Sequence, residues 1–363
     1  MKRFLTLLIA CAALSISAMA QNVKFVDATE LGIHGYTKKT DKSPYYRYDY
    51  TLYEEGLSKS AVSHSKKCPG LYVVFKTNSS QISATWENVA ARMGDNTTGI
   101  SQQGLDLYIK ADGKWKYAAV GRVSTLPQNN KRTKTLIKNL PEGDKECLLY
   151  LPLWCELVSL QIGVDEGATI EGLPSPFRHK VVVHGSSITH GASASRSGMT
   201  YPARMSRNLG IDFINFGFSG QCKMQPQFLE FLKTCEADAF IFDAFSNPSE
   251  KQIKERLEGF VKGMVEAHPG KPLIFIQSPI DQDSRFNTKK YAARMSLTKT
   301  AAEMMKELRK QYKDVYFLAE PDVLGTDATI DNSHPTDLGF DRFIKAYQPK
   351  IAKILKKYGI KGN

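Results

Sequence analysis

Three residues in the C-terminal half have types and spacing suited to acyl transfer. Ser187 lies in the tight turn His184-Gly185-Ser186-Ser187 directly after an apolar run, and His334 follows Asp331 by three residues. A serine hydroxyl becomes an effective nucleophile when a neighbouring base accepts its proton, and histidine suits that role near neutral pH. A nearby carboxylate could fix the histidine tautomer. We therefore predict that Ser187 is a nucleophile, His334 its base and Asp331 the group that orients the base.

An acyl-transfer site also needs hydrogen-bond donors for the developing oxyanion, each worth about 10²–10³ in rate. The candidates are the backbone N–H groups of Ser187 and Gly220 and the side-chain amide of Asn247. Each residue also has a structural interpretation. Ser187 could cap a helix, Gly220 and Asn247 could be ordinary loop residues, and local turns could hold the Asp331/His334 loop.

The elements around these residues alternate between apolar strands and amphipathic helices. Ser249 and Gln252 have the spacing of a capping box, and apolar residues then recur at helical spacing. This alternation predicts an α/β doubly wound parallel sheet covered on both faces. Such sheets bind ligands at the carboxyl ends of their strands, where the candidate residues lie. The strands are predicted at residues 181–183, 213–214, 239–242, 273–276 and 315–318.

The first half consists of short β-branched and aromatic segments separated by turn residues. Its strands are predicted at residues 71–75, 81–86, 104–109 and 147–153, with a hairpin turn at Ala111-Asp112-Gly113-Lys114. This pattern is typical of an all-β sandwich or jelly roll. The Pro/Gly/Ser stretch 172–176 suits a linker. We therefore expect a β-sandwich domain over residues 21–175 and an α/β domain over residues 176–363.

Four stretches of the second half, in this order, resemble the sequence blocks of the SGNH (GDSL-type) hydrolases, serine esterases and lipases on a flavodoxin-like sheet. They are Gly185-Ser-Ser-Ile-Thr189, Asn215-Phe-Gly-Phe-Ser-Gly220, Asp243-Ala-Phe-Ser-Asn247 and Asp331-Asn-Ser-His-Pro335. The resemblance implies that Ser187 is the nucleophile, that Gly220 and Asn247 are oxyanion donors, and that His334 and Asp331 are the base and its orienter.

The chain departs from the usual family pattern at two positions. Ser186 stands where the first block usually has Asp, and Pro248 follows Asn247 where the third block usually has Asp. Both departures resemble a sub-branch of exported bacterial SGNH esterases. That sub-branch carries an N-terminal β-domain named for a Gly-x-Asp-Leu-Tyr motif, which Gly104-Leu-Asp-Leu-Tyr108 fits. With it, the resemblance extends over nearly the whole mature chain.

The N-terminus has the pattern of a secretory signal over residues 1–20. Lys2 and Arg3 precede an apolar run that ends near Ala18-Met-Ala20. Cys11 lies in a lipoprotein-like stretch, but the apolar run continues past it, which disfavours lipidation. No later stretch reaches the 18 apolar residues of a membrane span. We expect an exported protein, periplasmic or extracellular, without an integral membrane segment.

The composition excludes several other classes of protein. The 363 residues include 42% hydrophobic and 24% charged residues, which is typical of a folded globular chain. The net charge of +12 comes from scattered lysines, which indicates a solvated surface rather than a nucleic-acid partner. The histidines and cysteines lack metal-ligand spacing, and no phosphate-binding loop occurs. We therefore expect no metal, cofactor or nucleic acid; the five cysteines beyond the signal could form at most two disulfides.

Other polar and aromatic residues allow more than one interpretation. Arg196 could reach a substrate oxygen from the loop after the nucleophile, or form a salt bridge that fixes this loop. His184 and His190 flank the nucleophile turn and more often play structural roles. Three aromatic residues of the first half could stack on a sugar, although such residues more often pack a core. They are Trp86, Trp115 and Tyr108.

Together these features predict a secreted serine esterase that forms an acyl-enzyme without a cofactor. The expected substrate is a small-molecule or glycan ester, with an acetyl or other small acyl group on a carbohydrate. Two alternatives remain: a lipase or phospholipase with the same mechanism, and a glycan-binding protein that has lost activity, to which the departures at Ser186 and Pro248 point. The sequence does not indicate the oligomeric state.

Overall fold

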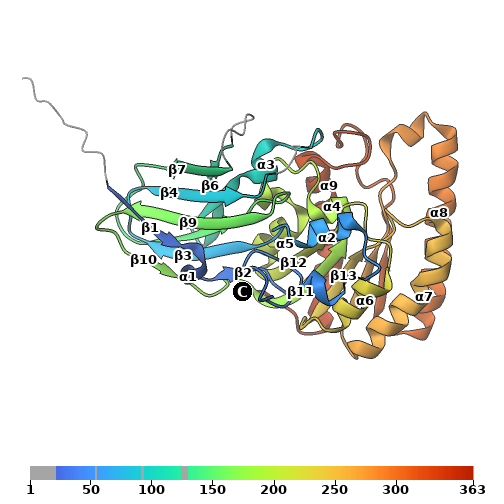
Figure 1. Cartoon of the computed structure of the whole chain (residues 1–363). Coiled ribbons are helices and arrows are strands. Elements are labelled where there is room, and N and C mark those ends of the chain that lie inside the picture. The colour runs from blue at the N-terminus through green and yellow to red at the C-terminus, as the bar shows by residue number, and fades with distance from the viewer. Residues whose placement is uncertain (1–21, 54, 91–93, 124–129, 363) are drawn as a thin grey trace, which may run out of the picture.

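The computed structural model describes residues 22–53, 55–90, 94–123 and 130–362. Within this part of the chain, two antiparallel sheets lie beside an α/β unit (Figure 1). The predicted signal at residues 1–20, including Cys11, lies outside the described residues. Among those described, no helix is long and apolar enough to cross a membrane.

The N-terminal sheets face each other as a β-sandwich, as predicted. One has the strand order β1-β9-β4-β7 and the other β10-β3-β8-β5-β6, with β2 paired to β3. Their facing apolar side chains, among them Phe75, Trp86 and Leu149, form one fully buried core. The strands are β1 (Val23–Asp27), β2 (Ile33–His34), β3 (Tyr72–Thr77), β4 (Ile82–Asn88), β5 (Leu105–Ala111), β6 (Lys114–Gly121), β7 (Lys131–Ile137), β8 (Lys145–Tyr150), β9 (Leu157–Asp165) and β10 (Ile170–Gly172).

The strands predicted in this half correspond to β3, β4, β5 and β8. The predicted hairpin also forms: Asp112 and Gly113 both have positive φ, and Ala111 pairs with Lys114. Strands β1, β7 and β9 were not predicted. They lie in the sheet whose outer face meets solvent, so polar residues interrupt their apolar pattern, as in Lys131–Ile137.

The C-terminal unit has a five-stranded parallel sheet with the order β12-β11-β13-β14-β15. This is the flavodoxin-like order, with the second strand outside the first. The predicted strands are all present, because continuous apolar runs such as Val181–Val183 suit a sheet buried on both faces. The strands are β11 (Arg178–Gly185), β12 (Ile211–Gly217), β13 (Ala239–Asp243), β14 (Leu273–Ile276) and β15 (Val315–Leu318).

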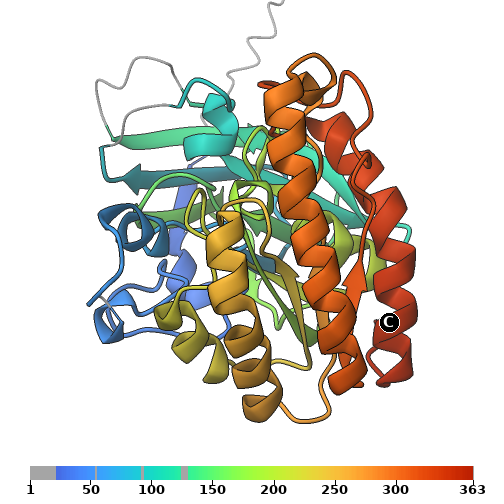
Figure 2. The same ribbon diagram turned by 90° about the vertical axis from the view of Figure 1, so that its right-hand side faces the viewer.

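Helices cover both faces of the parallel sheet. Side chains of α6, α7 and α8 pack in the core on one face, and those of α5 and α9 pack on the other. Figure 2 shows these helices from the side away from the sandwich. The predicted capping box forms at Ser249 and Gln252. The helices are α4 (Ser187–His190), α5 (Tyr201–Leu209), α6 (Pro226–Lys233), α7 (Glu250–Ala267), α8 (Thr288–Gln311) and α9 (Asp337–Lys357), with 3₁₀ turns η2 (Ser197–Met199) and η3 (Gln282–Arg285).

An N-terminal segment joins the two units. Beyond β2 the chain forms η1 (Tyr50–Leu52) and α2 (Lys59–Ser65), while short helices α1 (Ala28–Leu31) and α3 (Gly99–Gln103) belong to the sandwich. Tyr48 is fully buried among apolar residues of the α/β unit. The buried guanidinium of Arg47 donates to the carbonyls of Asn215 and Gly217 at the end of β12. The first half of the chain therefore supports the strand end that leads to Gly220.

Candidate active site

The nucleophile turn is formed by the end of β11 and the start of α4. Ser186 is the N-cap of α4 and accepts a bond from the Ile188 N–H, so Ser187 occupies the first helical position. The N–H of a first helical residue has no acceptor inside its helix and can bind a ligand oxygen. Gly185 is required for space: an added Cβ would lie 2.0 Å from Oγ1 of Thr189.

Two hydrogen bonds connect Ser187, His334 and Asp331 in a row. Ser187 Oγ is 2.8 Å from His334 Nε2, and His334 Nδ1 is 2.7 Å from Asp331 Oδ2. The other carboxylate oxygen, Oδ1, accepts the backbone N–H of His334 at 2.9 Å. The carboxylate therefore fixes both the backbone and the ring of the histidine. One end of the imidazole faces a carboxylate and the other faces a hydroxyl, which is the arrangement that proton transfer from serine needs.

A residue of the first half, Asn96, completes this arrangement. Its Nδ2 donates to Asp331 Oδ2 at 2.9 Å and lies 3.4 Å from His334 Nδ1. Partial burial alone would raise the pKa of Asp331, but the bonds from Asn96 and His334 outweigh it and lower that pKa to about 2. Sequence reasoning missed Asn96, because the polar stretch Gly94-Asp-Asn-Thr-Thr98 has the composition of any surface turn.

Ser186, which stands where the family usually has Asp, has a defined partner below the nucleophile. Its Oγ donates to Oδ2 of the buried Asp243 at 2.9 Å, and Thr189 donates to the same oxygen at 3.0 Å. Burial raises the pKa of Asp243 to about 6, against these donors. The departure at Ser186 therefore anchors the turn to the end of β13.

The two predicted oxyanion donors lie on loops beside the nucleophile turn. Gly220 is exposed, with φ of +69°, in the turn after β12. Asn247 lies in the loop after β13, and its Oδ1 accepts the Cys222 N–H at 3.2 Å. Cys222 lies two residues after Gly220, and its N–H occupies the oxygen of the Asn247 amide. The NH₂ group of this amide is therefore the end oriented to donate elsewhere. Pro248 is buried and begins the approach to α7.

A cavity of about 220 Å³ opens at His334. Both halves of the chain line it: Lys67, Asn96 and Trp154 from the first half, and Ser219 and His334 from the second. A larger hollow of about 630 Å³ lies around the amino end of β11. It contains none of the candidate residues, whereas His334 lines the smaller cavity.

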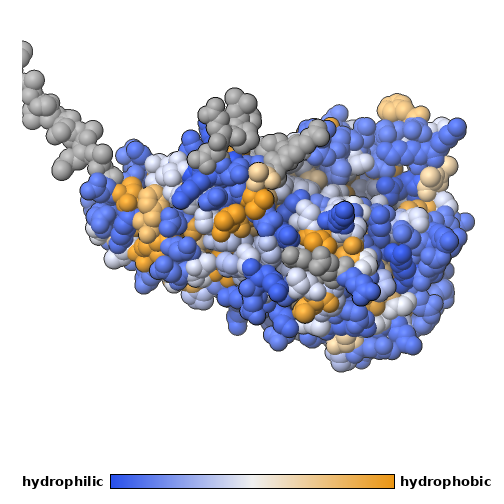
Figure 3. Space-filling view, in the orientation of Figure 1, coloured by the Kyte–Doolittle hydropathy of each residue, from blue (hydrophilic) through white to orange (hydrophobic). Residues whose placement is uncertain are grey.

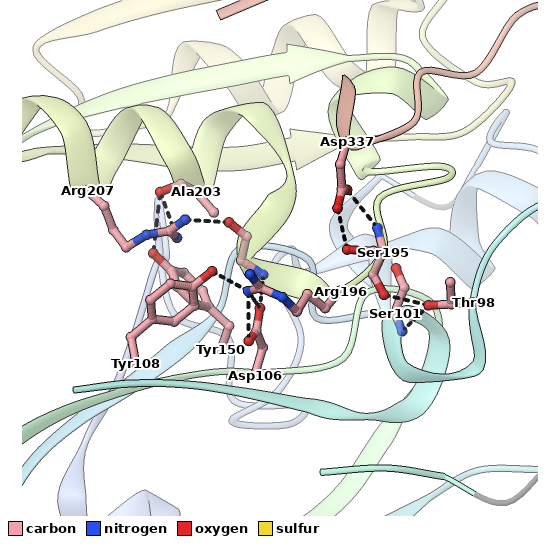
Figure 4. Close-up of polar contacts among 11 residues, drawn as sticks. Thr98, Ser101, Asp106, Tyr108, Tyr150, Ser195, Arg196, Ala203, Arg207 and Asp337 are labelled. Atoms are coloured by element: carbon pink, nitrogen blue, oxygen red, sulfur yellow. Dashed lines mark hydrogen bonds and ion pairs between the residues drawn. The ribbon is translucent and has the colours of Figure 1, made fainter. Parts of the chain in front are cut away.

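Arg196 forms the salt bridge that was one of its two predicted roles. Its guanidinium bonds the buried carboxylate of Asp106 at 2.9 Å and the Tyr108 hydroxyl (Figure 4). It also lies 3.9 Å from the centre of the Tyr117 ring. Asp106 also accepts the Gly198 N–H at 2.8 Å. The Gly-x-Asp-Leu-Tyr motif therefore binds the loop that follows the nucleophile helix.

The loop that contains Ser195 and Arg196 also contacts the segment that follows His334. Thr98 donates to the Ser195 carbonyl at 2.6 Å, and the Ser195 N–H donates to Asp337 at 3.0 Å (Figure 4). Asp337 begins α9, three residues after His334. Contacts between the two halves thus lie on both sides of the candidate residues.

The other residues singled out from the sequence have structural roles. His184 and His190 are fully buried, and their rings bond backbone carbonyls of Phe216 and Leu153. Trp86 and Tyr108 are buried in packed clusters, which does not suit a sugar platform. Cys68, Cys147, Cys155, Cys222 and Cys235 are buried free thiols. Within the described ranges, no group of three or more potential ligands could hold a metal ion.

Two family models match the chain. The GDSL-like lipase/acylhydrolase family matches residues 178–352, and a model described as the N-terminus of Esterase_SGNH_hydro-type matches residues 23–170. No curated protein matches the chain.

Solved structures share the arrangement of both halves. A Bacteroides ovatus protein, described provisionally as a GDSL-like lipase, is 43% identical with a TM-score of 0.88, covering 92% of this chain and 98% of its own. A salicylyl acyltransferase from a tetracycline biosynthetic pathway is 20% identical, with a TM-score of 0.70 over 92% and 97% of the two chains. An acetyl xylan esterase from Butyrivibrio proteoclasticus is 14% identical, with a TM-score of 0.53 over 80% and 90%. The last two establish similarity of fold alone.

Proposed function

Because this chain belongs to the GDSL-like lipase/acylhydrolase family and is a carboxylic ester hydrolase, we propose that Ser187, His334 and Asp331 are its catalytic triad and that it removes acetyl or other small acyl groups from carbohydrates. The observation that carries the triad is the hydrogen-bonded sequence from Ser187 Oγ through the His334 ring to Asp331.

In the proposed mechanism, His334 Nε2 accepts the Ser187 proton as Oγ attacks the ester carbonyl. The tetrahedral oxyanion is held by the N–H groups of Ser187 and Gly220 and by the Asn247 amide. His334 then gives its proton to the leaving alcohol, which leaves an acyl-serine. A water molecule, deprotonated by the same nitrogen, attacks the acyl carbon; the carboxylic acid departs and the serine regains its proton. Asp331 stays ionised throughout and stabilises the imidazolium.

Two observations support a small acyl group on a polar alcohol. The cavity at His334 is small, at about 220 Å³, and most of its lining residues are polar. The face of the molecule shown in Figure 3 is mainly hydrophilic, with hydrophobic side chains in separate patches, whereas a lipase needs a broad apolar surface for its substrate. An acetyl xylan esterase is among the structural neighbours. We also propose that residues 1–20 direct export to the periplasm or the exterior.

The first test compares hydrolysis of an aryl acetate by the wild type, Ser187→Ala and Ser60→Ala. Ser60 is an exposed serine of α2 and serves as the matched control. We expect Ser187→Ala to lose about 10³-fold or more in kcat, with Ser60→Ala unchanged. Equal rates for all three proteins, with retained glycan binding, would instead identify an inactive glycan-binding protein.

The acyl and alcohol specificity is tested with purified wild-type protein. We expect acetate release from acetylated xylan and a rate that falls steeply as the acyl chain of aryl esters lengthens. Efficient cleavage of long-chain esters, without acetate release from the glycan, would support the lipase alternative and refute the proposed substrate class.

A further inference from the structure

The cavity at His334 is rich in hydrogen-bond donors. The described residues that line it include Lys67 but neither aspartate nor glutamate. Two of the others, Thr97 and Trp154, carry buried donor groups, Oγ1 and Nε1, that bond to no residue in the described ranges. A cavity with this lining favours a ligand that supplies acceptors and negative charge.

Lys67 itself is half-buried and has no carboxylate partner in the part of the chain that the structure describes. Its Nζ lies 3.1 Å from His64 Nδ1 and 5.3 Å from the centre of the Trp154 ring. None of the ion pairs among the described residues includes Lys67 or the neighbouring, fully buried Arg47. Arg47 bonds only backbone carbonyls in those ranges. Of these two cations, Lys67 lines the cavity, and no carboxylate among the described residues pairs with its charge.

The titratable groups next to Lys67, His64 and Cys155, carry no negative charge that could balance its ammonium group. His64 is buried, and burial, with Lys67 and Arg47 adding to it, lowers its pKa to about 3, so it is neutral. Cys155 is also neutral, because burial raises its pKa. Burial lowers the pKa of Lys67 to about 8, so its ammonium form is still present at neutral pH. An anion from outside the chain is the group that would complete this environment.

We propose that Lys67 binds a carboxylate carried by the substrate, so that the preferred esters are anionic. The inference rests on the proposed esterase function and specifies its substrate class. The carboxylate could belong to the alcohol, as in an acetylated uronic acid, or to the acyl group, as in a hemisuccinate. In either position it reaches the cavity beside His334, which Lys67, Thr97 and Trp154 also line.

The experiment measures kcat/KM for two matched pairs of esters. The first pair is acetylated glucuronic acid and acetylated glucose; the second is 4-nitrophenyl hemisuccinate and 4-nitrophenyl acetate. The proteins are the wild type, Lys67→Gln and Lys59→Gln, where Lys59 is an exposed lysine that begins α2. We expect the wild type to prefer the anionic member of one pair by about tenfold or more, and Lys67→Gln to abolish that preference. Lys59→Gln should keep it.

The ratio of kcat/KM for the anionic ester to that for the neutral ester distinguishes two roles of Lys67: recognition of charge and positioning of the loop at Ser219. Lys67 contacts His64, which hydrogen bonds the Ser219 backbone next to Gly220. If Lys67 served only to position that loop, Lys67→Gln would slow neutral and anionic esters equally, and the proposal would be overturned. A wild type without preference in either pair would overturn it as well, while leaving the esterase function intact.

A binding measurement keeps the inference testable if no ester is turned over. Calorimetric titration of Ser187→Ala with glucuronate, glucose and succinate requires no catalysis. We expect glucuronate or succinate to bind at least tenfold more tightly than glucose, and the added Lys67→Gln substitution to remove the difference. Equal weak binding of all three would refute carboxylate recognition, independently of whether the protein is an esterase.

Discussion

Replacement of Asn96 by alanine tests whether the β-sandwich contributes to catalysis. The substitution removes one donor from Asp331 Oδ2, at 2.9 Å, and leaves the His334 ring as the remaining described donor to that oxygen. A hydrogen bond to a charged group contributes about 1.5–3 kcal/mol. Asp331 is about one-third exposed, so water compensates part of the loss, and about 1–2 kcal/mol is expected at the transition state. This predicts a fall in kcat of roughly 5- to 30-fold.

The assay is steady-state hydrolysis of an aryl acetate at pH 7.5, with thermal unfolding measured in parallel. KM should change little, because Asn96 acts on the base and not on the acyl group. Asp95→Ala, which alters the exposed neighbouring residue, is the matched control and should behave as wild type. An Asn96→Ala enzyme with wild-type kcat would refute the reasoning. An equal fall in kcat for Asp95→Ala would also refute it, because the loss would then come from the loop and not from the bond to Asp331.

Three further predictions concern charged groups in the site and in the contacts that hold its loops. Asp243→Asn should stabilise the protein at pH 8. The pKa of about 6 in the fold lies above the ordinary value near 4, so the wild type loses stability between pH 4 and 6, and the loss stays at about 3 kcal/mol above pH 6. Urea unfolding at pH 8 and pH 4 should therefore show the gain only at pH 8. Arg196→Met leaves the buried carboxylate of Asp106 unpaired and should lower the unfolding free energy by about 3 kcal/mol, whereas a change below 0.5 kcal/mol, by the same measurement, would contradict the role of this pair. Since burial and the charge of Arg47 lower the pKa of Lys67 to about 8, the preference for anionic over neutral esters should be present at pH 7 and fade above pH 8; a ratio constant from pH 7 to 9.5 would contradict this.

Local patterns in the sequence are enough to predict the strands of the parallel sheet and the candidate triad. Continuous apolar runs identified the five strands of the parallel sheet, because both faces of that sheet are buried. Residue types and order identified Ser187, Asp331 and His334, which the structure brings within hydrogen-bonding distance. These features depend on short-range patterns, which a single sequence displays directly.

Only the folded chain shows which residues of the first half lie at the site. Asn96 contacts Asp331 across 235 positions of sequence, and Arg196 contacts Asp106 across 90. Lys67 became a candidate for substrate recognition only when the cavity showed which groups lie around it. Such contacts depend on how the sandwich packs against the α/β unit. That packing follows from the shape and chemistry of two complete surfaces, and no periodicity or motif within one segment encodes it.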